Sequence, residues 1–251
     1  MDLVLLTALG VGGATVIGAL FGFIFRKTTH RFSDIVLSFA AGVMLSAAVL
    51  GLILPSLELG GKYGIITTVL GIFAGALFIG VLDRVVPHLH KPTPSEDEEK
   101  HRNRDINRVI LFVAAIAIHN LPEGIAAGVG FGTDDVTGAI FIAAGIALQN
   151  LPEGMVIVAP MLSVGVKPAR AFLIAAATGL VEVVGTLIGY LATYFSGAVL
   201  PFALAAAGGC MLYVISDEII PETHAHGHQR GATYALLFGF AIMLIMDFLL
   251  V

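Results

Sequence analysis

Eight long apolar segments constrain this chain more than any other feature of its sequence. A helix needs about 20 apolar residues to cross the hydrocarbon core of a bilayer. Because 57% of the 251 residues are hydrophobic and only 12% are charged, the composition excludes an ordinary soluble domain. Continuous runs such as LLFGFAIMLIMDFLLV do not alternate, which excludes a membrane β-barrel. The expected spans are about 3–25, 33–54, 64–86, 107–130, 136–160, 168–190, 198–220 and 232–250.

These segments predict an all-α integral membrane protein, an eight-transmembrane-helix bundle that forms a single transporter domain over residues 1–251. Pro122 and Pro152 fall inside the fourth and fifth spans. A proline within a helix removes an amide donor and clashes with the preceding turn. We therefore expect helices four and five to be broken by proline, with the freed carbonyl groups lining a polar cavity.

Basic residues are distributed unevenly between the two sides of the predicted bundle. Of the 13 Lys and Arg residues, all but Lys62 fall in the loops of one side. Cytoplasmic loops carry the excess of basic residues, so this side is expected to be cytoplasmic. The sequence thus predicts a multi-pass protein of the plasma or bacterial inner membrane with both termini outside. No basic face remains for binding nucleic acid.

The longest polar segment covers about residues 87–106 and contains HLHKPTPSEDEEKHRNRD. This composition cannot bury enough apolar surface to fold, so we expect a flexible cytoplasmic loop. Histidines occur here and in the segment HAHGH, which lies on the same predicted side. Two interpretations stay open for them: incidental residues, or weak cytoplasmic metal ligands. These histidines are His88, His90, His224, His226 and His228.

Two nearly identical polar phrases interrupt the apolar spans, IHNLPEGIAAG from residue 118 and LQNLPEGMVIV from residue 148. An ionised carboxylate at the centre of a membrane helix costs about 2.5–3.5 kcal/mol. No Lys or Arg lies in the middle of a span to pair with Glu123, Glu153 or Glu182. A bound cation would neutralise them. The alternative, a protonated glutamate hydrogen-bonded between helices, stays open above all for Glu182.

The spacing within each phrase places possible metal ligands on one face of a helix. The first and last polar residues of each phrase are four apart, so both side chains project from one helix face. The asparagine between them could reach a second ion or a neighbouring helix. Consecutive spans are antiparallel, so the two phrases should meet near the midplane, as inverted repeats do in transporters. The candidate ligands are His119, Asn120, Glu123, Gln149, Asn150, Glu153 and Glu182.

The paired HNLPEG and QNLPEG motifs resemble the signature of the ZIP (Zrt/Irt-like protein) divalent metal transporters, particularly their GufA-type branch. The segments AAGVMLSA and SDEIIPETH resemble that family's second and seventh spans. The resemblance implies a binuclear site, with Met44 approaching the first ion; ordinary packing is the alternative for Met44. By this resemblance, His119, Glu123, Gln149 and Glu153 surround the first ion, and Asn120, Asn150 and Glu182 surround the second together with the shared Glu123 and Glu153.

The sequence departs from the family pattern at three positions. The family often has an acid where Asn150 stands, a proline where Val183 stands and a histidine where Asp217 stands. The neutral Asn150 makes the second metal position less negative. Whether both positions are filled therefore stays open.

The function indicated is transport of divalent transition-metal cations, foremost zinc uptake toward the cytoplasm, with alternating access that the resemblance implies to be elevator-like. A mixed imidazole and carboxylate site suits Zn²⁺, and Cd²⁺, Fe²⁺ and Mn²⁺ fit nearly as well. A metal-selective channel is the main alternative. An intramembrane metallohydrolase lacks an HExxH motif and a separate nucleophile here, so we expect no enzyme. The expected partners are the metal ion and the lipid bilayer, with a homodimer left open.

Overall fold

The computed structural model describes the backbone of residues 1–25, 29–85, 98–133, 135–195 and 197–250, and all regular secondary structure in this part of the chain is helical. The predicted all-α class is therefore confirmed. The elements are α1 (Asp2–Ile24), α2 (His30–Ser46), η1 (Ala47–Ile53), α3 (Leu54–Leu59), η2 (Gly61–Tyr63), α4 (Gly64–Val85), α5 (Glu98–Gly130), α6 (Val136–Ser163), α7 (Pro168–Phe195), η3 (Gly197–Val199), α8 (Leu200–Val214), η4 (Ile215–Ile219), α9 (Ile220–His224) and α10 (Gln229–Leu250).

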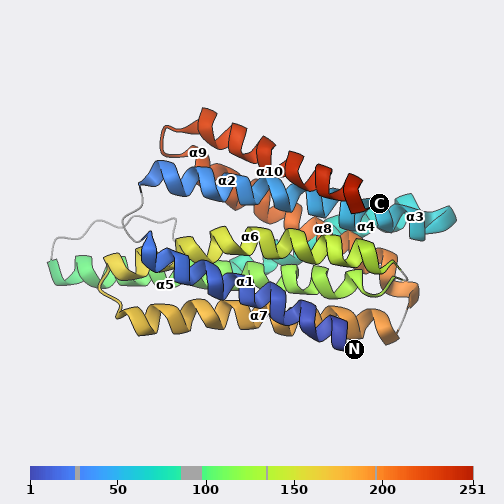
Figure 1. The fold of residues 1–251 in the computed structure, drawn as a ribbon, viewed down its shortest axis with the longest axis horizontal. Helices are drawn as coiled ribbons and strands as arrows, with labels where there is room; N and C mark the ends of the chain where they lie inside the picture. Colours follow the sequence, from blue (N-terminus) through green and yellow to red (C-terminus); the bar gives the residue numbers. More distant parts are fainter. Residues whose placement is uncertain (26–28, 86–97, 134, 196, 251) are drawn as a thin grey trace.

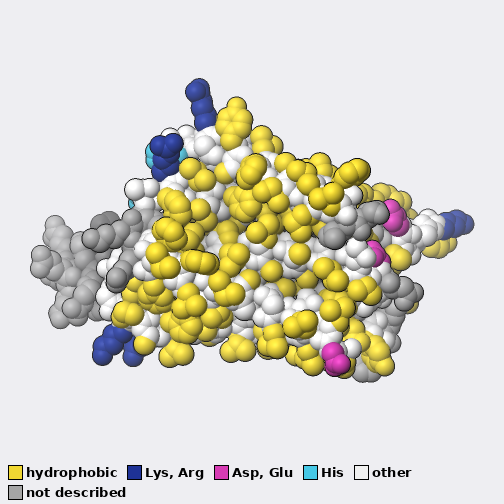
Figure 2. All heavy atoms as spheres, viewed as in Figure 1, with side chains coloured by type: hydrophobic (Ala, Val, Ile, Leu, Met, Phe, Trp, Pro, Cys, Tyr) yellow, Lys and Arg dark blue, Asp and Glu magenta, His cyan; other side chains and the backbone are white. Residues whose placement is uncertain are grey.

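Seven helical segments in the described part of the chain are long and apolar enough to cross a membrane. Two of them are composite, because α2, η1 and α3 run on as one segment and so do α8, η4 and α9. Apolar side chains cover the middle of the surface, while charged side chains lie toward its two ends (Figure 2). The helix α5, which carries the first polar phrase, is the remaining candidate for an eighth span.

The predicted proline breaks are not seen. Both α5 and α6 remain α-helical through Pro122 and Pro152. One proline removes a single bond of the helix ladder, and the neighbouring helices hold the rest of each helix in place. Helical geometry changes elsewhere, in the π-helical turns η1 and η4, which lie shortly before Pro55 and Pro221. Such turns are frequent at functional sites.

The helix α5 begins inside the segment 87–106, which was predicted to be a loop. Residues 86–97, which include His88 and His90, lie outside the described residues, and α5 already begins at Glu98. The sequence from Glu98 to Arg104 is rich in Glu, Lys and Arg, which favour helix even when they bury nothing. Acidic residues at a helix start also interact well with its dipole.

The helices form two groups (Figure 1). In the first group, α1 packs on α6 and α7, and α5 packs on α7 and α6. In the second, α2 pairs with α10 and α4 pairs with α8. The start of α1 and the end of α10 lie at the same end of the bundle. The polar phrases of α5 and α6 thus belong to the first group.

Glycines bring helix backbones into direct contact within each group. A β-carbon added to these glycines would lie inside van der Waals distance of a carbonyl oxygen on the facing helix. Contacts between the groups are different, because glycines there face side chains: Gly51 faces Ile142, and Gly145 faces Met243. The within-group glycines are Gly12, Gly18, Gly22, Gly124, Gly128, Gly154, Gly179, Gly185 and Gly189 in the first group, and Gly42, Gly75, Gly209 and Gly239 in the second.

Candidate metal-binding site

All polar side chains of the two phrases are buried. His119, Asn120 and Glu123 come from α5, and Gln149, Asn150 and Glu153 come from α6. Each is at most 8% exposed, and both asparagines are completely covered. A further predicted ligand, Glu182 of α7, is completely buried as well. The fold therefore gathers seven polar side chains, three of them carboxylates, in the interior of an apolar bundle.

Several polar atoms of this cluster lack hydrogen-bond partners. Among the described residues, both carboxylate oxygens of Glu123 and both polar atoms of the Gln149 carboxamide make no hydrogen bond. Gln149 nevertheless lies within interaction distance of Glu123, which is also close enough to Glu153 for their charges to interact. Glu153 interacts electrostatically with His119. Buried donors and acceptors without a protein partner are rare in folded proteins, and they mark a place for a ligand.

Glu182 has a different environment from Glu123. Its Oε1 accepts a hydrogen bond of 2.7 Å from Thr15 Oγ1 of α1. The same oxygen accepts from Asn120 Nδ2, and Oε2 accepts from Asn150 Nδ2. Polar hydrogens from three helices therefore surround this carboxylate.

Two of the phrase glycines set how closely the helices approach this centre. A β-carbon on Gly124 would collide with the carbonyl group of Glu182, and one on Gly154 would collide with the carbonyl oxygen of Thr15. Each of these glycines directly follows a motif glutamate. Only glycine permits this approach, which brings α7 against α5 and α1 against α6.

A residue that the list of predicted ligands omits, Glu218, also reaches the site. Its Oε1 lies 2.7 Å from His119 Nε2, across from α5 on the π-helical turn η4. These two atoms are buried but do not meet in hydrogen-bond geometry. The signal available in the sequence was the segment SDEIIPETH. Its neighbour Asp217 is exposed and does not take part.

Met44 lies in the last turn of α2, shortly before η1, and is 1% exposed. It belongs to the main apolar cluster together with Ala47, Ile146 and Met243. This cluster joins the two helix groups. Packing accounts for its burial, and its role as a ligand stays a prediction.

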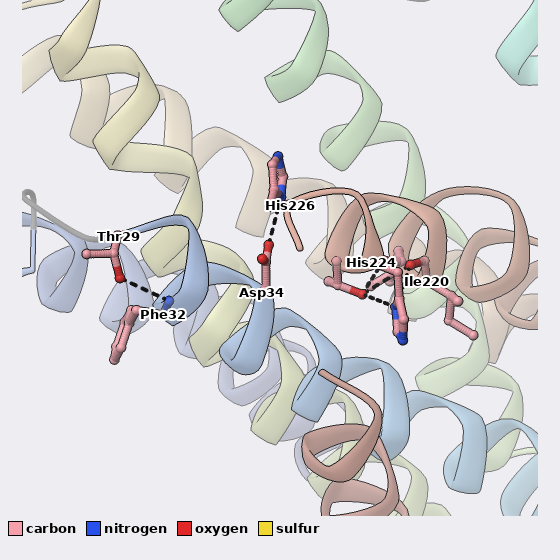
Figure 3. Close-up of polar contacts among 8 residues, drawn as sticks. Thr29, Phe32, Asp34, Ile220, His224 and His226 are labelled. Atoms are coloured by element: carbon pink, nitrogen blue, oxygen red, sulfur yellow. Dashed lines mark hydrogen bonds and ion pairs between the residues drawn. The ribbon is translucent and has the colours of Figure 1, made fainter. Parts of the chain in front are cut away.

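The histidines of the segment HAHGH lie in and beside the turn between α9 and α10 (Figure 3). His226 Nδ1 is 3.0 Å from Oδ1 of Asp34 on α2, and its ring stacks on His30 with centroids 4.6 Å apart. The other oxygen of Asp34 is buried without a hydrogen-bond partner among the described residues. His224 differs, because its Nδ1 bonds the Ile220 carbonyl and its Nε2 bonds Thr233. His228 is exposed.

Chemically, the central cluster offers one imidazole, several carboxylates and carboxamide oxygens. In the described part of the chain, no three His, Cys, Asp or Glu side chains are arranged closely enough to hold an ion by themselves. An ion bound between α5 and α6 would therefore need the Gln149 oxygen, or a small inward movement of the carboxylates. Such a mixed nitrogen and oxygen set suits Zn²⁺ and similar ions.

Comparison with known proteins gives a consistent result. The family described as "ZIP Zinc transporter" matches residues 90–247. The zinc transporter ZIPB of Bordetella bronchiseptica is 39% identical over 93% of this chain and 77% of its own length. The zinc transporter GufA of Myxococcus xanthus is 36% identical over 97% of both chains. The zinc transporter ZupT of Chlorobium chlorochromatii is 33% identical over 93% of this chain and 92% of its own.

Proposed function

Since this chain belongs to the ZIP zinc transporter family, and is thus a transporter of divalent metal and not an enzyme, we propose that it carries zinc toward the cytoplasm through the central cluster of α5 and α6. The observation that carries this proposal is the set of buried polar atoms without partners on Glu123, Gln149 and His119. A Zn²⁺ ion would satisfy lone pairs there that no protein group satisfies. Glu218 would either bind the ion beside His119 or hold the His119 ring in place through its contact with Nε2.

The ligand types favour zinc without making the site exclusive. Imidazole from His119 and carboxylates from Glu123 and Glu153 suit borderline ions, so Cd²⁺, Fe²⁺ and Mn²⁺ are further candidate substrates. Mg²⁺ prefers oxygen ligands in octahedral geometry and gives up its water reluctantly. We expect it to be excluded.

The orientation of the bundle in the membrane bears on the side to which inward-moving zinc would be released. The basic side chains visible in Figure 2 lie mainly at the end opposite the two termini. Basic residues mark the cytoplasmic side of membrane proteins. This distribution supports a cytoplasmic position for the loops between α1 and α2 and between α4 and α5, with both termini outside.

The two helix groups support alternating access. Backbone-to-backbone glycine contacts hold α1, α5, α6 and α7 together, so we expect these helices to move as one body. The surface between the groups is formed by apolar side chains, among them Met44, Ile146 and Met243. Such a surface carries few directional bonds and permits sliding. The first group would thus move the site past the second, as in an elevator.

The cytoplasmic histidines are proposed as weak ligands on the release side. His226 with Asp34 is the best supported pair, because the second oxygen of Asp34 has no partner among the described residues. Asp34 and Met44 are ten residues apart on α2, so about 15 Å separates the two levels along the helix axis. His224 is the least available, since both ring nitrogens are already engaged.

Zinc uptake into proteoliposomes tests the central proposal. Glu123→Ala and Glu153→Ala should each abolish uptake while leaving the protein in the membrane, because each removes an anionic ligand. Glu58→Ala, which removes an exposed carboxylate in α3, is the matched control and should transport normally. Near-normal uptake by either motif variant would overturn the site. Flux that rises without saturation as zinc increases would favour a channel.

A further inference from the structure

We infer that the centre of this protein binds a single ion, and that the second position implied by the family resemblance is a hydrogen-bonded network in which Thr15 of α1 positions Glu182. This inference rests on the proposed function, since it concerns the same site. It gives Glu182 and both asparagines a role other than direct metal binding. It also adds Thr15, which belongs to neither polar phrase.

Hydrogen bonds already satisfy the Glu182 carboxylate. Oε1 receives the Thr15 hydroxyl at 2.7 Å and the Asn120 amide, and Oε2 receives the Asn150 amide. All of these side chains are at most 3% exposed. Hydrogen bonds to an ionised acceptor are among the stronger ones in proteins. The charge of Glu182 is thus compensated by protein dipoles.

Backbone acceptors fix the orientation of both carboxamides. Asn120 Nδ2 also donates to the Thr178 carbonyl at 3.3 Å, and Asn150 Nδ2 also donates to the Val11 carbonyl at 3.2 Å. Each of these nitrogens lies between a backbone carbonyl and a carboxylate, which can only accept. An oxygen in that place would face two acceptors. The asparagines therefore present N–H groups to Glu182, and N–H groups repel a cation.

Most of the cluster's polar atoms without partners among the described residues belong to side chains of the first ion position. Both oxygens of Glu123 and both polar atoms of Gln149 are unpaired among the described residues, as is His119 Nε2 except for its contact with Glu218. The carbonyl oxygens of the two asparagines, which are also unpaired, remain available to the same ion or to its water. Glu182 contributes no unpaired oxygen.

An aspartate at position 150 would change this balance. Its carboxylate has no N–H group, so it could neither donate to Glu182 Oε2 nor to the Val11 carbonyl. Two carboxylates would then face each other, and a second cation would be the natural group to bridge them. The neutral Asn150 is therefore what keeps the second position free of metal.

Thr15 joins three helices at this point. Its hydroxyl donates to Glu182 of α7, and its carbonyl oxygen faces Gly154 of α6 so closely that a β-carbon at Gly154 would collide with it. Together with Asn120 of α5, the network ties all four helices of the first group around one carboxylate. Its function is positioning: it holds α5 and α6 at the separation that the single ion needs.

Zinc stoichiometry of the purified full-length protein tests the inference. Equilibrium dialysis would count the zinc bound by the wild type, by Glu123→Ala and by Asn150→Asp. Zinc that Glu123→Ala still binds is bound by the cytoplasmic histidines, and subtracting it gives the number of ions at the central site. We expect one central zinc in the wild type and two in Asn150→Asp. Two in the wild type, or one in Asn150→Asp, would overturn the inference while leaving the transport function intact. No central zinc in the wild type would instead refute the proposed function.

Substitution of Thr15 gives a second test that does not depend on the Asn150 variant folding. Thr15→Val keeps the side-chain shape and removes the donor, whereas Thr15→Ser keeps the donor. We expect Thr15→Val to keep one central zinc but to bind it at least several-fold more weakly, and Thr15→Ser to bind as the wild type does. Equal affinity in all three proteins would overturn the positioning role of Thr15.

Discussion

Substitution of Gly179 by alanine tests whether backbone contact between α1 and α7 sets the geometry of the site. A β-carbon on Gly179 would lie 2.5 Å from the carbonyl oxygen of Gly12, whereas real β-carbons essentially never approach closer than 3.0 Å. The two helices must therefore separate by at least about 0.5 Å, and by about 0.9 Å to reach the ordinary contact distance of 3.4 Å. Overpacking of this kind costs about 1–3 kcal/mol.

The same separation acts on the Thr15–Glu182 hydrogen bond, because Thr15 follows Gly12 by one turn on α1 and Glu182 follows Gly179 by one turn on α7. Its present length is 2.7 Å, so a shift of about 0.5–0.9 Å would stretch it to roughly 3.2–3.6 Å. Hydroxyl bonds to oxygen are normally 2.5–3.0 Å long, so this one would be largely lost. We expect Gly179→Ala to lower both the thermal midpoint and the affinity for zinc.

Gly13→Ala is the matched control. A β-carbon on Gly13, next to Gly12 on α1, would meet no atom within 4 Å. Alanine is favoured over glycine inside a helix by up to about 1 kcal/mol, so this variant should melt at or above the wild-type midpoint. Thermal unfolding in detergent and zinc uptake into proteoliposomes would compare the two. Equal behaviour of Gly179→Ala and Gly13→Ala would refute the argument that the glycine contact fixes the helix separation.

Three further outcomes are expected from measurements of zinc binding and uptake. His119→Gln should lower zinc affinity more than Gln149→Ala, because imidazole is the better zinc ligand. Calorimetric titration in which Gln149→Ala is the more damaging would contradict this. Glu218→Gln should weaken zinc binding, whereas Glu222→Gln, one turn away and exposed, should leave it unchanged. Magnesium should neither enter proteoliposomes nor compete with zinc, and measurable competition would argue against a nitrogen-containing site.

The sequence alone was sufficient to predict the all-α membrane class and the zinc transport function. The membrane class follows from apolar runs of span length. Zinc transport follows from the resemblance of the two polar phrases to the paired motif of the ZIP family, together with the metal-ligand types that they contain. The burial of His119 and Glu123 follows from their place inside an apolar run.

Other features depend on contacts that no short segment encodes. Thr15 and Glu182 are 167 positions apart, and an isolated threonine in an apolar span is usually unremarkable. Glu218 reaches His119 from a π-helical turn, where the ordinary helical period does not indicate which residue faces inward. The prolines predicted breaks in α5 and α6 that the structure does not contain. Packing by neighbouring helices keeps both helices continuous despite the lost hydrogen bonds.

The π-helical turn η4 has a consequence for how this span could change during evolution. A π turn accommodates one residue more than the α-helical ladder needs, so the residues after it are rotated by about 100° relative to an uninterrupted helix. Loss of one residue within Ile215–Ile219 would convert the turn to regular α-helix and would turn the whole segment from Pro221 to His224 away from its present neighbours. When relatives of different length are aligned, a one-residue gap within this membrane span is therefore structurally meaningful, and it should coincide with a different acid, or none, opposite His119.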